Sequence, residues 1–283
     1  MTTFGFIGAG NMASAIVRGA VAAGLTRRAD KGGAGHRVLV TSAHGSAARL
    51  AQQTGAELVA QASALVQESD VVVLAVKPHV IPGVLEELSQ ELAASKPLVV
   101  SIAAGLSLEK LEAMLPAGTR VVRAMPNMAA AVGESMTALA AGSAASQEDL
   151  DIVEELMAAV GRTVVLAEKD FSAFIGLAGS SPAFVFTFID ALARAGVLGG
   201  IPKAQAVEIV AQAVAGSART VQAEAERRER GEAGRTPADL VDAVCSPGGT
   251  TVAGVVAMEQ AGFSCAVIEA FRATVARDRE LGA

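Results

Sequence analysis

A glycine turn near the start of the sequence has the residue types and the spacing to hold a phosphate. Gly8 and Gly10 follow the apolar run 3–7 and precede a stretch with helical periodicity. Gly8 lets the chain turn without a Cβ clash, Gly10 lets the backbone approach a pyrophosphate, and Ala13 fills the position where a small residue permits close packing. The spacing alone is weak and fits an ordinary glycine turn equally well. Its place between a strand-like run and a helix favours dinucleotide binding, with the anion at the helix N-terminus.

A second turn, far along the chain, combines the same kind of backbone freedom with hydroxyl groups. Its sequence is Cys245-Ser246-Pro247-Gly248-Gly249-Thr250-Thr251, and a helical pattern follows it. Successive backbone N–H groups in such a turn form a concavity for an anion, strengthened by the positive end of the helix dipole. The simpler alternative is a helix start that Ser and Thr side chains cap. A cap does not need two glycines, so the sequence favours an anion site.

The end of the second strand-like run, 36–41, indicates which dinucleotide would bind. In NAD enzymes of this architecture an acidic residue at this strand end holds the ribose 2′-hydroxyl. Asp30 has about the right spacing but precedes the strand, so it is interpreted as a solvated loop charge. The strand is followed by Ser42 and His44 instead, and a hydroxyl without a carboxylate favours NADP over NAD. His44 is the weaker candidate, because an exposed histidine is mostly neutral at pH 7.

Further strand-like runs alternate with helical patterns, which predicts a strand–helix order throughout this part of the chain. The runs are 70–76, 97–102, 120–125, 136–140 and 163–166. The first is nearly all apolar and β-branched, as in strands that a parallel sheet buries on both faces. Lys77 follows it at the edge where open α/β sheets bind ligands, although a solvated lysine is nearly as good an interpretation. The residues 103–105 and 126–127, which follow two other strands, suit packing against a flat nicotinamide ring.

After Leu166 the periodicity becomes helical and no further strand is expected. The helical segments are 171–177, 182–198, 203–230, 237–244 and 250–279, the last broken near Gly262. The charged stretch from Glu224 to Arg235 is interpreted as a solvated helix end and loop without chemistry. The sequence thus predicts two domains. Residues 1–167 form an α/β Rossmann-type dinucleotide-binding domain, and residues 168–283 form an all-helical domain.

Composition excludes several classes of function. The 283 residues are 52% apolar and 18% charged, which is typical of a globular protein. A net charge of −6 and the absence of Tyr and Trp argue against nucleic-acid binding. Uninterrupted apolar runs stay shorter than the ~18 residues that a membrane span needs. No signal peptide is evident, and the two cysteines suggest neither disulfides nor a metal site, so a cytoplasmic protein is expected. The apolar excess with few charges predicts an oligomer.

With both turns in view, the chain resembles the pyrroline-5-carboxylate reductase family, whose members make proline with NAD(P)H. The resemblance runs from end to end and covers the motifs GFIGAGNM at residue 5, AVKP at residue 75, SIAAG at residue 101 and GSSPAF at residue 179. The most specific motif is SPGGTT at residue 246. The resemblance implies reduction of 1-pyrroline-5-carboxylate to L-proline, with NADPH as cofactor and NADH as an alternative. It also implies that the helical domains of two subunits interleave as a homodimer, and that dimers can assemble further.

The resemblance also implies roles for individual residues. The substrate carboxylate would be held by the Ser246 hydroxyl and the backbone amides of Gly248, Gly249 and Thr250. Thr251 would face the ring nitrogen and is the expected catalytic residue. The residues matching family positions that line the cofactor are Ile7, Gly8, Ala9, Gly10, Asn11, Met12, Ser42, Ala75, Val76, Lys77, Pro78, Ala103 and Ala104.

The sequence departs from the family pattern in two loops and one side chain. The segments 27–35 and 226–235 are longer than expected, and a family acid that can approach the substrate ring falls in the second, so this acid is not assigned. Phe184 stands where relatives often have Tyr.

Two alternatives to the reductase come from other classes of protein. One is a 3-hydroxyacid dehydrogenase of similar build, which needs a lysine at the start of the second domain. The corresponding stretch, 175–183, has none. The other is a catalytically silent NADP-binding regulator, against which the intact Ser246 to Thr251 turn argues.

Overall fold

The computed structural model describes residues 1–26 and 35–282 and divides the chain into two compact units. The first unit is Met1–Ser180 with the C-terminal end from Thr274, and the second is Ser181–Ala273. The C-terminal end joins the first unit through a hydrogen bond of 2.8 Å from the Ser172 hydroxyl to the Asp278 carboxylate. The domain boundary expected after residue 167 falls between the last strand and the helix that leads into the second unit, and it stays a prediction.

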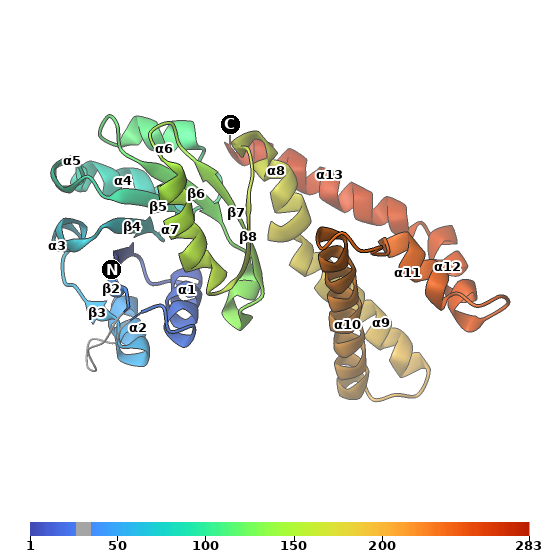
Figure 1. Cartoon of the computed structure of the whole chain (residues 1–283). Helices are drawn as coiled ribbons and strands as arrows, with labels where there is room; N and C mark the ends of the chain where they lie inside the picture. Colours follow the sequence, from blue (N-terminus) through green and yellow to red (C-terminus); the bar gives the residue numbers. More distant parts are fainter. Residues whose placement is uncertain (27–34, 283) are drawn as a thin grey trace. The chain divides into compact units, whose positions relative to one another are not determined.

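The first unit is built on an eight-stranded sheet in the order β3-β2-β1-β4-β5-β6-β7-β8 (Figure 1). The strands are β1 (Thr3–Ile7), β2 (Arg37–Thr41), β3 (Glu57–Leu58), β4 (Val71–Leu74), β5 (Leu98–Ser101), β6 (Val121–Met125), β7 (Ser135–Ala141) and β8 (Gly161–Val165). Neighbouring strands are parallel except β6 and β7, which pair antiparallel. The Rossmann-type α/β architecture predicted for this part is confirmed.

The strand–helix order expected throughout this region is wrong at one connection. Between β6 and β7 the chain makes only a short 3₁₀ turn, η2 (Met128–Val132), and no helix crosses the sheet. A parallel return needs a long crossover, so a strand that follows a short turn must pair antiparallel. The two-residue strand β3 was not expected either, because it is too short to show an alternating pattern.

Helices cover both faces of the sheet. They are α1 (Asn11–Ala22), α2 (Ser46–Thr54), α3 (Ala62–Glu68), η1 (Pro78–Val80), α4 (Ile81–Glu87), α5 (Ser89–Ser95), α6 (Leu108–Met114), α7 (Gln147–Ala158), η3 (Glu168–Asp170), α8 (Phe171–Phe174) and the π-helical turn η4 (Ile175–Gly179). Alternate strand residues enter two separate cores. Phe6 and Val73 pack with α1 and α7, whereas Ile7 and Val72 pack with α3 to α6. The strand ends that border both cores are thereby held rigidly.

The second unit is helical, as the sequence predicts. Its helices are α9 (Ser181–Leu198), α10 (Lys203–Glu229), α11 (Pro237–Val244), α12 (Thr250–Gln260) and most of α13 (Phe263–Gly282). The break expected near Gly262 is present, and Gly262 has a positive φ of 82° there. Among residues 181–273, all of which the structure describes, only Ala193, Ala206, Val210 and Glu224 are buried. Most apolar side chains of these helices are therefore exposed in a single chain.

One continuous helical stretch, Glu168–Leu198, is long and apolar enough to cross a membrane by length and composition, and the bent pair α12–α13 passes the same test only if taken together. The sequence prediction counted uninterrupted apolar residues and took 183–189 as the apolar run in this region, which Asp190 ends. Core helices of soluble proteins meet the same criterion, so composition alone does not assign this helix to a membrane.

Candidate active site

An open cleft of about 1960 Å³ lies where β1, β2, β4 and β5 end. It lies at the carboxyl ends of parallel strands, the edge at which open α/β sheets bind ligands. The cleft brings together all thirteen residues that match the family's cofactor positions. These are Ile7, Gly8, Ala9, Gly10, Asn11, Met12, Ser42, Ala75, Val76, Lys77, Pro78, Ala103 and Ala104. Their contacts with a cofactor stay a prediction.

Gly8 has a backbone conformation that a residue with a side chain would adopt only with strain. Its φ is 104°, and a Cβ at this position would lie 2.6 Å from the carbonyl oxygen of Ala75. The Gly8 N–H donates to the Thr41 carbonyl at 2.9 Å, and the Ala75 N–H donates to the Ile7 carbonyl at 2.9 Å. Gly8 therefore lets the β1 turn lie directly against the ends of β2 and β4, at the floor of the cleft.

Gly10 leaves space at the start of α1. It is the N-cap residue, no side chain caps the helix, and no atom lies within 4 Å of the position that a Cβ would take. The first N–H groups of a helix have no partner within the helix, so an uncapped start in an open cleft suits a phosphate. Ala13 is 1% exposed and packs into the core, as its position in the motif requires.

Hydroxyl groups gather where β2 ends. Ser42 Oγ accepts a hydrogen bond of 2.9 Å from the Ala47 N–H and lies 3.1 Å from Ser46 Oγ. Ser42, His44 and Ser46 all line the cleft, and α2 begins at Ser46 without a side-chain cap. Ser46 was not expected from the sequence, although its place in the first turn of the following helix could have indicated it. The Asp30 interpretation falls in the segment 27–34, outside the described residues.

Other residues of the cleft were missed because they follow elements that were themselves missed. Gln61 and Ser63 lie just after the short strand β3, and residues 128 and 130–133 belong to the η2 region between the antiparallel strands β6 and β7. Pro126 and Asn127, expected beside the nicotinamide, do not line the cleft. The Asn127 side chain is used internally. It accepts from the Ala129 N–H at 3.1 Å and donates to the Ala178 carbonyl at 2.9 Å.

The second unit carries the other candidate site, in the turn between α11 and α12. Gly249 N–H donates to the Ser246 carbonyl at 2.9 Å and closes the turn. Gly248 has a φ of 69°, and a Cβ on Gly249 would collide with the Ser246 hydroxyl oxygen. Both glycines are therefore needed for this backbone path, and the Ser246 hydroxyl folds over the turn.

The hydroxyl-capped alternative does not occur at this turn. Gly249 is the N-cap of α12, and no side chain bonds to the first N–H groups of the helix. Ser246, Thr250 and Thr251 are exposed. A groove of about 410 Å³ begins at Gly248 and Gly249 and continues along the apolar side chains of α12 from Val252 to Ala257. The arrangement offers an anion site at one end and an apolar surface next to it.

Comparisons with known proteins are consistent over the whole chain. The family described as pyrroline-5-carboxylate reductase dimerisation matches residues 168–281, and the family described as NADP oxidoreductase coenzyme F420-dependent matches residues 3–105. The pyrroline-5-carboxylate reductase of Escherichia coli (strain K12) is 39% identical over 277 residues, which cover 98% of this chain and 97% of that protein.

Solved structures are similar over the same extent. A pyrroline-5-carboxylate reductase from Coxiella burnetii superimposes with a TM-score of 0.89 at 32% identity, covering 100% of this chain and 99% of the other. The pyrroline carboxylate reductase of Plasmodium falciparum, solved with NADP bound, has a TM-score of 0.82 at 26% identity and covers 100% of this chain and 98% of the other. The identities, the coverage and the Ser-Pro-Gly-Gly-Thr-Thr turn agree, and this chain belongs to the pyrroline-5-carboxylate reductase family.

Proposed function

We propose that this chain is an NADPH-dependent oxidoreductase that reduces the C=N bond of 1-pyrroline-5-carboxylate and forms L-proline, the last step of proline biosynthesis. The observation that carries the proposal is the turn from Ser246 to Thr251. It is exposed, it is built on two glycines, and it opens an uncapped helix. Such a turn suits the carboxylate of a small cyclic imino acid.

The cofactor residues of the proposal lie in the cleft of the first unit. The space at Gly10 and the uncapped start of α1 fit the pyrophosphate, and the hydroxyls at Ser42 and Ser46 fit the 2′-phosphate that distinguishes NADPH. Lys77 at the end of β4 adds a positive charge to the lining. When bound, the reduced nicotinamide supplies the hydride, and the protein supplies binding and orientation.

The substrate residues of the proposal lie in the second unit. The Ser246 hydroxyl and the N–H groups of Gly248 and Thr250 bind the carboxylate. Gly249, also assigned to the carboxylate from the sequence, donates its N–H to the Ser246 carbonyl and shapes the turn. The Thr251 hydroxyl bonds the ring nitrogen as that atom becomes tetrahedral. A cyclic imine is already electrophilic, especially when protonated, so the site needs alignment and exclusion of water more than a strong acid. Positioning of this kind can supply ~7–11 kcal/mol of the barrier.

We propose that the working form is a homodimer joined through the second unit and that dimers associate further. Exposed apolar side chains such as Phe186, Leu192 and Ile209 are 46–52% accessible in one chain, which supports a partner for these helices. The proposed enzyme is soluble and cytoplasmic, with a small-molecule substrate and neither nucleic acid nor membrane as partner.

A turnover assay tests the function directly. The purified protein is expected to oxidise NADPH when 1-pyrroline-5-carboxylate is added, with proline as the product, and to show no NADP reduction with 3-hydroxyacids. Oxidation of a hydroxyacid without imine reduction would assign the chain to the dehydrogenase class instead. Tight NADPH binding with neither reaction would indicate a silent regulator.

A further inference from the structure

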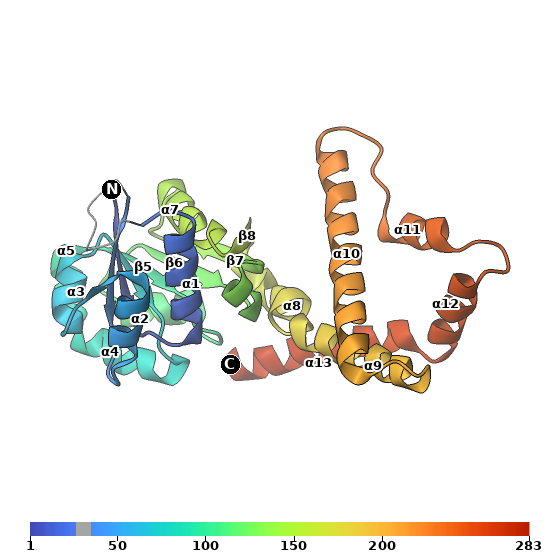
Figure 2. The ribbon, with the colours of Figure 1, turned by 90° about the horizontal axis from the view of Figure 1, so that it is seen from below.

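The loop that joins α10 to α11, residues 230–236, precedes the helix that leads into the turn from Ser246 to Thr251, here called the substrate turn. α11 buries none of its residues, so packing within this chain does not hold it. Its last residue, Val244, stands two positions before Ser246. The position of the turn therefore depends on what holds the start of α11, and Figure 2 shows the extended connection that leads there from the end of α10.

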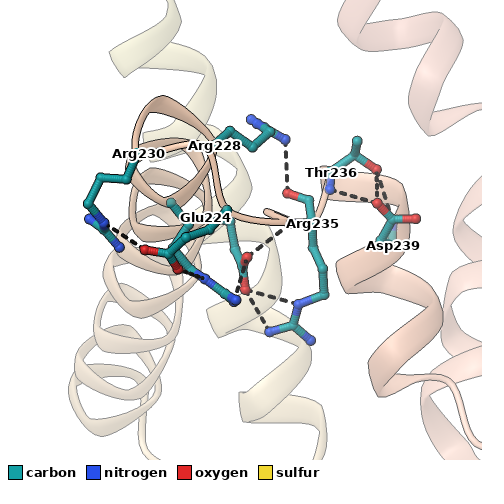
Figure 3. A network of polar contacts seen from close by, with 8 residues as sticks. Glu224, Arg228, Arg230, Arg235, Thr236 and Asp239 are labelled. Atoms are coloured by element: carbon teal, nitrogen blue, oxygen red, sulfur yellow. Dashed lines mark hydrogen bonds and ion pairs between the residues drawn. The ribbon is translucent and has the colours of Figure 1, made fainter.

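Glu224, one turn before the end of α10, is the anchor of this loop. Its side chain is buried, at 5% exposure for the residue, although glutamate is rarely buried unless paired. It accepts hydrogen bonds from the Arg235 backbone N–H at 2.9 Å and from Arg235 Nε at 2.9 Å, and Arg235 Nη2 lies 2.8 Å away (Figure 3). Both guanidinium nitrogens approach one carboxylate oxygen, Oε1, and the backbone N–H bonds to the other, Oε2, so both oxygens of Glu224 are held by Arg235. The interpretation of this stretch as a solvated helix end is therefore wrong at Glu224.

Neighbouring groups on α10 complete the attachment. Arg227 Nη1 donates to Glu224 at 3.3 Å, and Arg228 Nη1 donates to the Arg235 carbonyl at 3.1 Å. A Cβ on Gly234 would collide with the backbone carbonyl of Glu224, so the loop lies directly on the helix. Arg235 is held through its backbone N–H, its carbonyl and its side chain.

The next residue carries this attachment into α11. Thr236 is the N-cap of α11 and forms a capping box with Asp239, whose carboxylate accepts from the Thr236 N–H and hydroxyl at 2.7 Å each. The Asp239 N–H donates back to the Thr236 hydroxyl at 3.3 Å. A continuous series of bonds thus runs from α10 through Glu224, Arg235 and Thr236 to the first turn of α11.

We propose that Glu224 and Arg235 are positioning residues for the substrate turn. Their pairing fixes the start of α11 on α10, and α11 then sets the place of Ser246 to Thr251. This inference rests on the proposed function of that turn. The pKa of Glu224 is lowered by the backbone N–H of Arg235 first and its guanidinium second, so the carboxylate is ionised and the pairing is present at neutral pH.

The experiment compares Glu224→Gln, Arg235→Ala and the double variant with Arg230→Ala. Arg230 lies in the same loop region, but its guanidinium pairs with the exposed Glu232 and touches neither Glu224 nor α11. Three kinds of measurement are made on the intact protein. They are amide hydrogen exchange of residues 237–251, kcat and KM for 1-pyrroline-5-carboxylate, and the Kd for NADPH. The melting temperature and the mass in solution check folding and assembly.

Either single variant is expected to speed exchange in 237–251 while leaving α9 unchanged. The kcat/KM for 1-pyrroline-5-carboxylate should fall roughly 10- to 100-fold, mainly through KM, because misplaced binding groups lose that much. The Kd for NADPH should stay within about twofold, as should every value of Arg230→Ala. The double variant should lose no more than either single one, because both remove the same pairing.

Three results would overturn the inference. Exchange and KM equal to those of Arg230→Ala would show that α11 is held without this pairing. Faster exchange with an unchanged KM would show that the pairing does not position the substrate turn. An equal loss of NADPH affinity, or a monomeric product, would assign Glu224 to folding or assembly. Because the exchange measurement needs no substrate, a wild-type protein that fails to reduce the imine is recognised separately as failure of the proposed function.

Discussion

The two units solve the problem of burying apolar surface in different ways. In the first unit every central strand sends alternate residues into two cores, and side chains such as Phe6, Val72 and Leu111 have no exposed area. In the second unit, helices of 18 and 27 residues bury only Ala193, Ala206, Val210 and Glu224. The first unit buries its apolar side chains within one chain, whereas the second leaves most of its apolar side chains exposed.

This difference explains why the two candidate sites are held in place in different ways. The cofactor cleft borders rigid strand ends, so small residues such as Gly8 and Ala103 can define its shape by backbone alone. The substrate turn lies between α11 and α12, neither of which buries a residue in this chain. We propose that polar contacts from α10 and a second subunit hold it. Under the proposed function, the second unit combines assembly with substrate binding.

The largest expected effect comes from placing a charge on the exposed apolar surface of the second unit. Ile209→Glu on α10, where Ile209 is 51% exposed, should convert the dimer to monomers and abolish nearly all activity. Burial of such a side chain at an interface contributes ~1.5–3 kcal/mol, and a buried unpaired carboxylate costs more than that. Light scattering at micromolar concentration measures the mass, beside a turnover assay.

Leu58→Glu is the matched control for that prediction. Leu58 is 55% exposed on β3, at the edge of the sheet in the first unit, and it should leave mass and activity unchanged. A wild-type protein that is itself monomeric would contradict the comparison between the units. So would a loss of the dimer caused by Leu58→Glu alone.

The next effect concerns the catalytic role that we propose for Thr251 in the second unit. Thr251→Ala should lower kcat by ~10²–10³, the usual loss when one positioned polar contact to the reacting group is removed. The amides and Ser246 would still hold the carboxylate, so KM should rise less. Steady-state kinetics on the folded dimer measure both values.

Thr251→Ser keeps the hydroxyl and is the control, with most activity retained. If Thr251 only supports the start of α12, Thr251→Ala would lower the melting temperature and leave turnover per folded molecule unchanged. That result would restrict the second unit to assembly and carboxylate binding.

A smaller effect is expected from a substitution in the first unit, which should change the affinity for the cofactor and not that for the substrate. Ser42→Asp should weaken NADPH about 10- to 100-fold and NADH much less, because a carboxylate would face the 2′-phosphate; this range corresponds to ~1.4–2.8 kcal/mol. The new carboxylate can still accept from the Ala47 N–H, as Ser42 Oγ does, so α2 should keep its start. Titration of both cofactors measures the difference. Equal weakening of NADH and NADPH would remove Ser42 from the 2′-phosphate site.

The fold was largely predictable because its strongest signals are local. The run before Gly8, the β-branched strand 71–74 and the helical segment 237–244 each show their structure within a short window of sequence. The two errors in the sheet are the missing β3 and the direction of β7. The two residues of β3 are too few to show a pattern, and the direction of β7 depends on the length of the connection from β6. Residues of the cleft that follow them, such as Gln61 and Val132, were missed for the same reason.

The charged stretch at the end of α10 shows a different limit of the sequence. Glu224 lies among Arg and Glu residues that are mostly exposed, and its composition fits a solvated helix end equally well. Its burial results from the loop folding back so that Arg235, 11 residues later, covers the carboxylate. A contact between residues on either side of a turn cannot be inferred from charge pattern alone. The glycine turn before α12 was predictable from the sequence, and the contacts that hold α11 on α10 were not.

The smallest expected effect is a loss of stability at acid pH in the second unit. The carboxylate contacts that attach α11 to α10 should weaken on acidification, whereas the apolar core of the first unit should not. The pKa values of Glu224 and Asp239 are lowered by bonds from Arg235 and Thr236 respectively, and Arg227 also faces Glu224. A carboxyl group with a lowered pKa stabilises the folded state above its unfolded pKa, about 4.3 for glutamate, and loses that contribution as pH falls through the folded value.

The melting temperature of wild type should therefore exceed that of Glu224→Gln by a constant margin from about pH 6 to pH 8, and the margin should shrink below about pH 4. Glu269→Gln, which removes an exposed pair with Arg272, is the control and should show a smaller margin at neutral pH. If the difference in melting temperature between wild type and Glu224→Gln does not change on acidification, the contribution of Glu224 comes from its packing and not from its charge. That result would contradict an ionic attachment of α11 to α10.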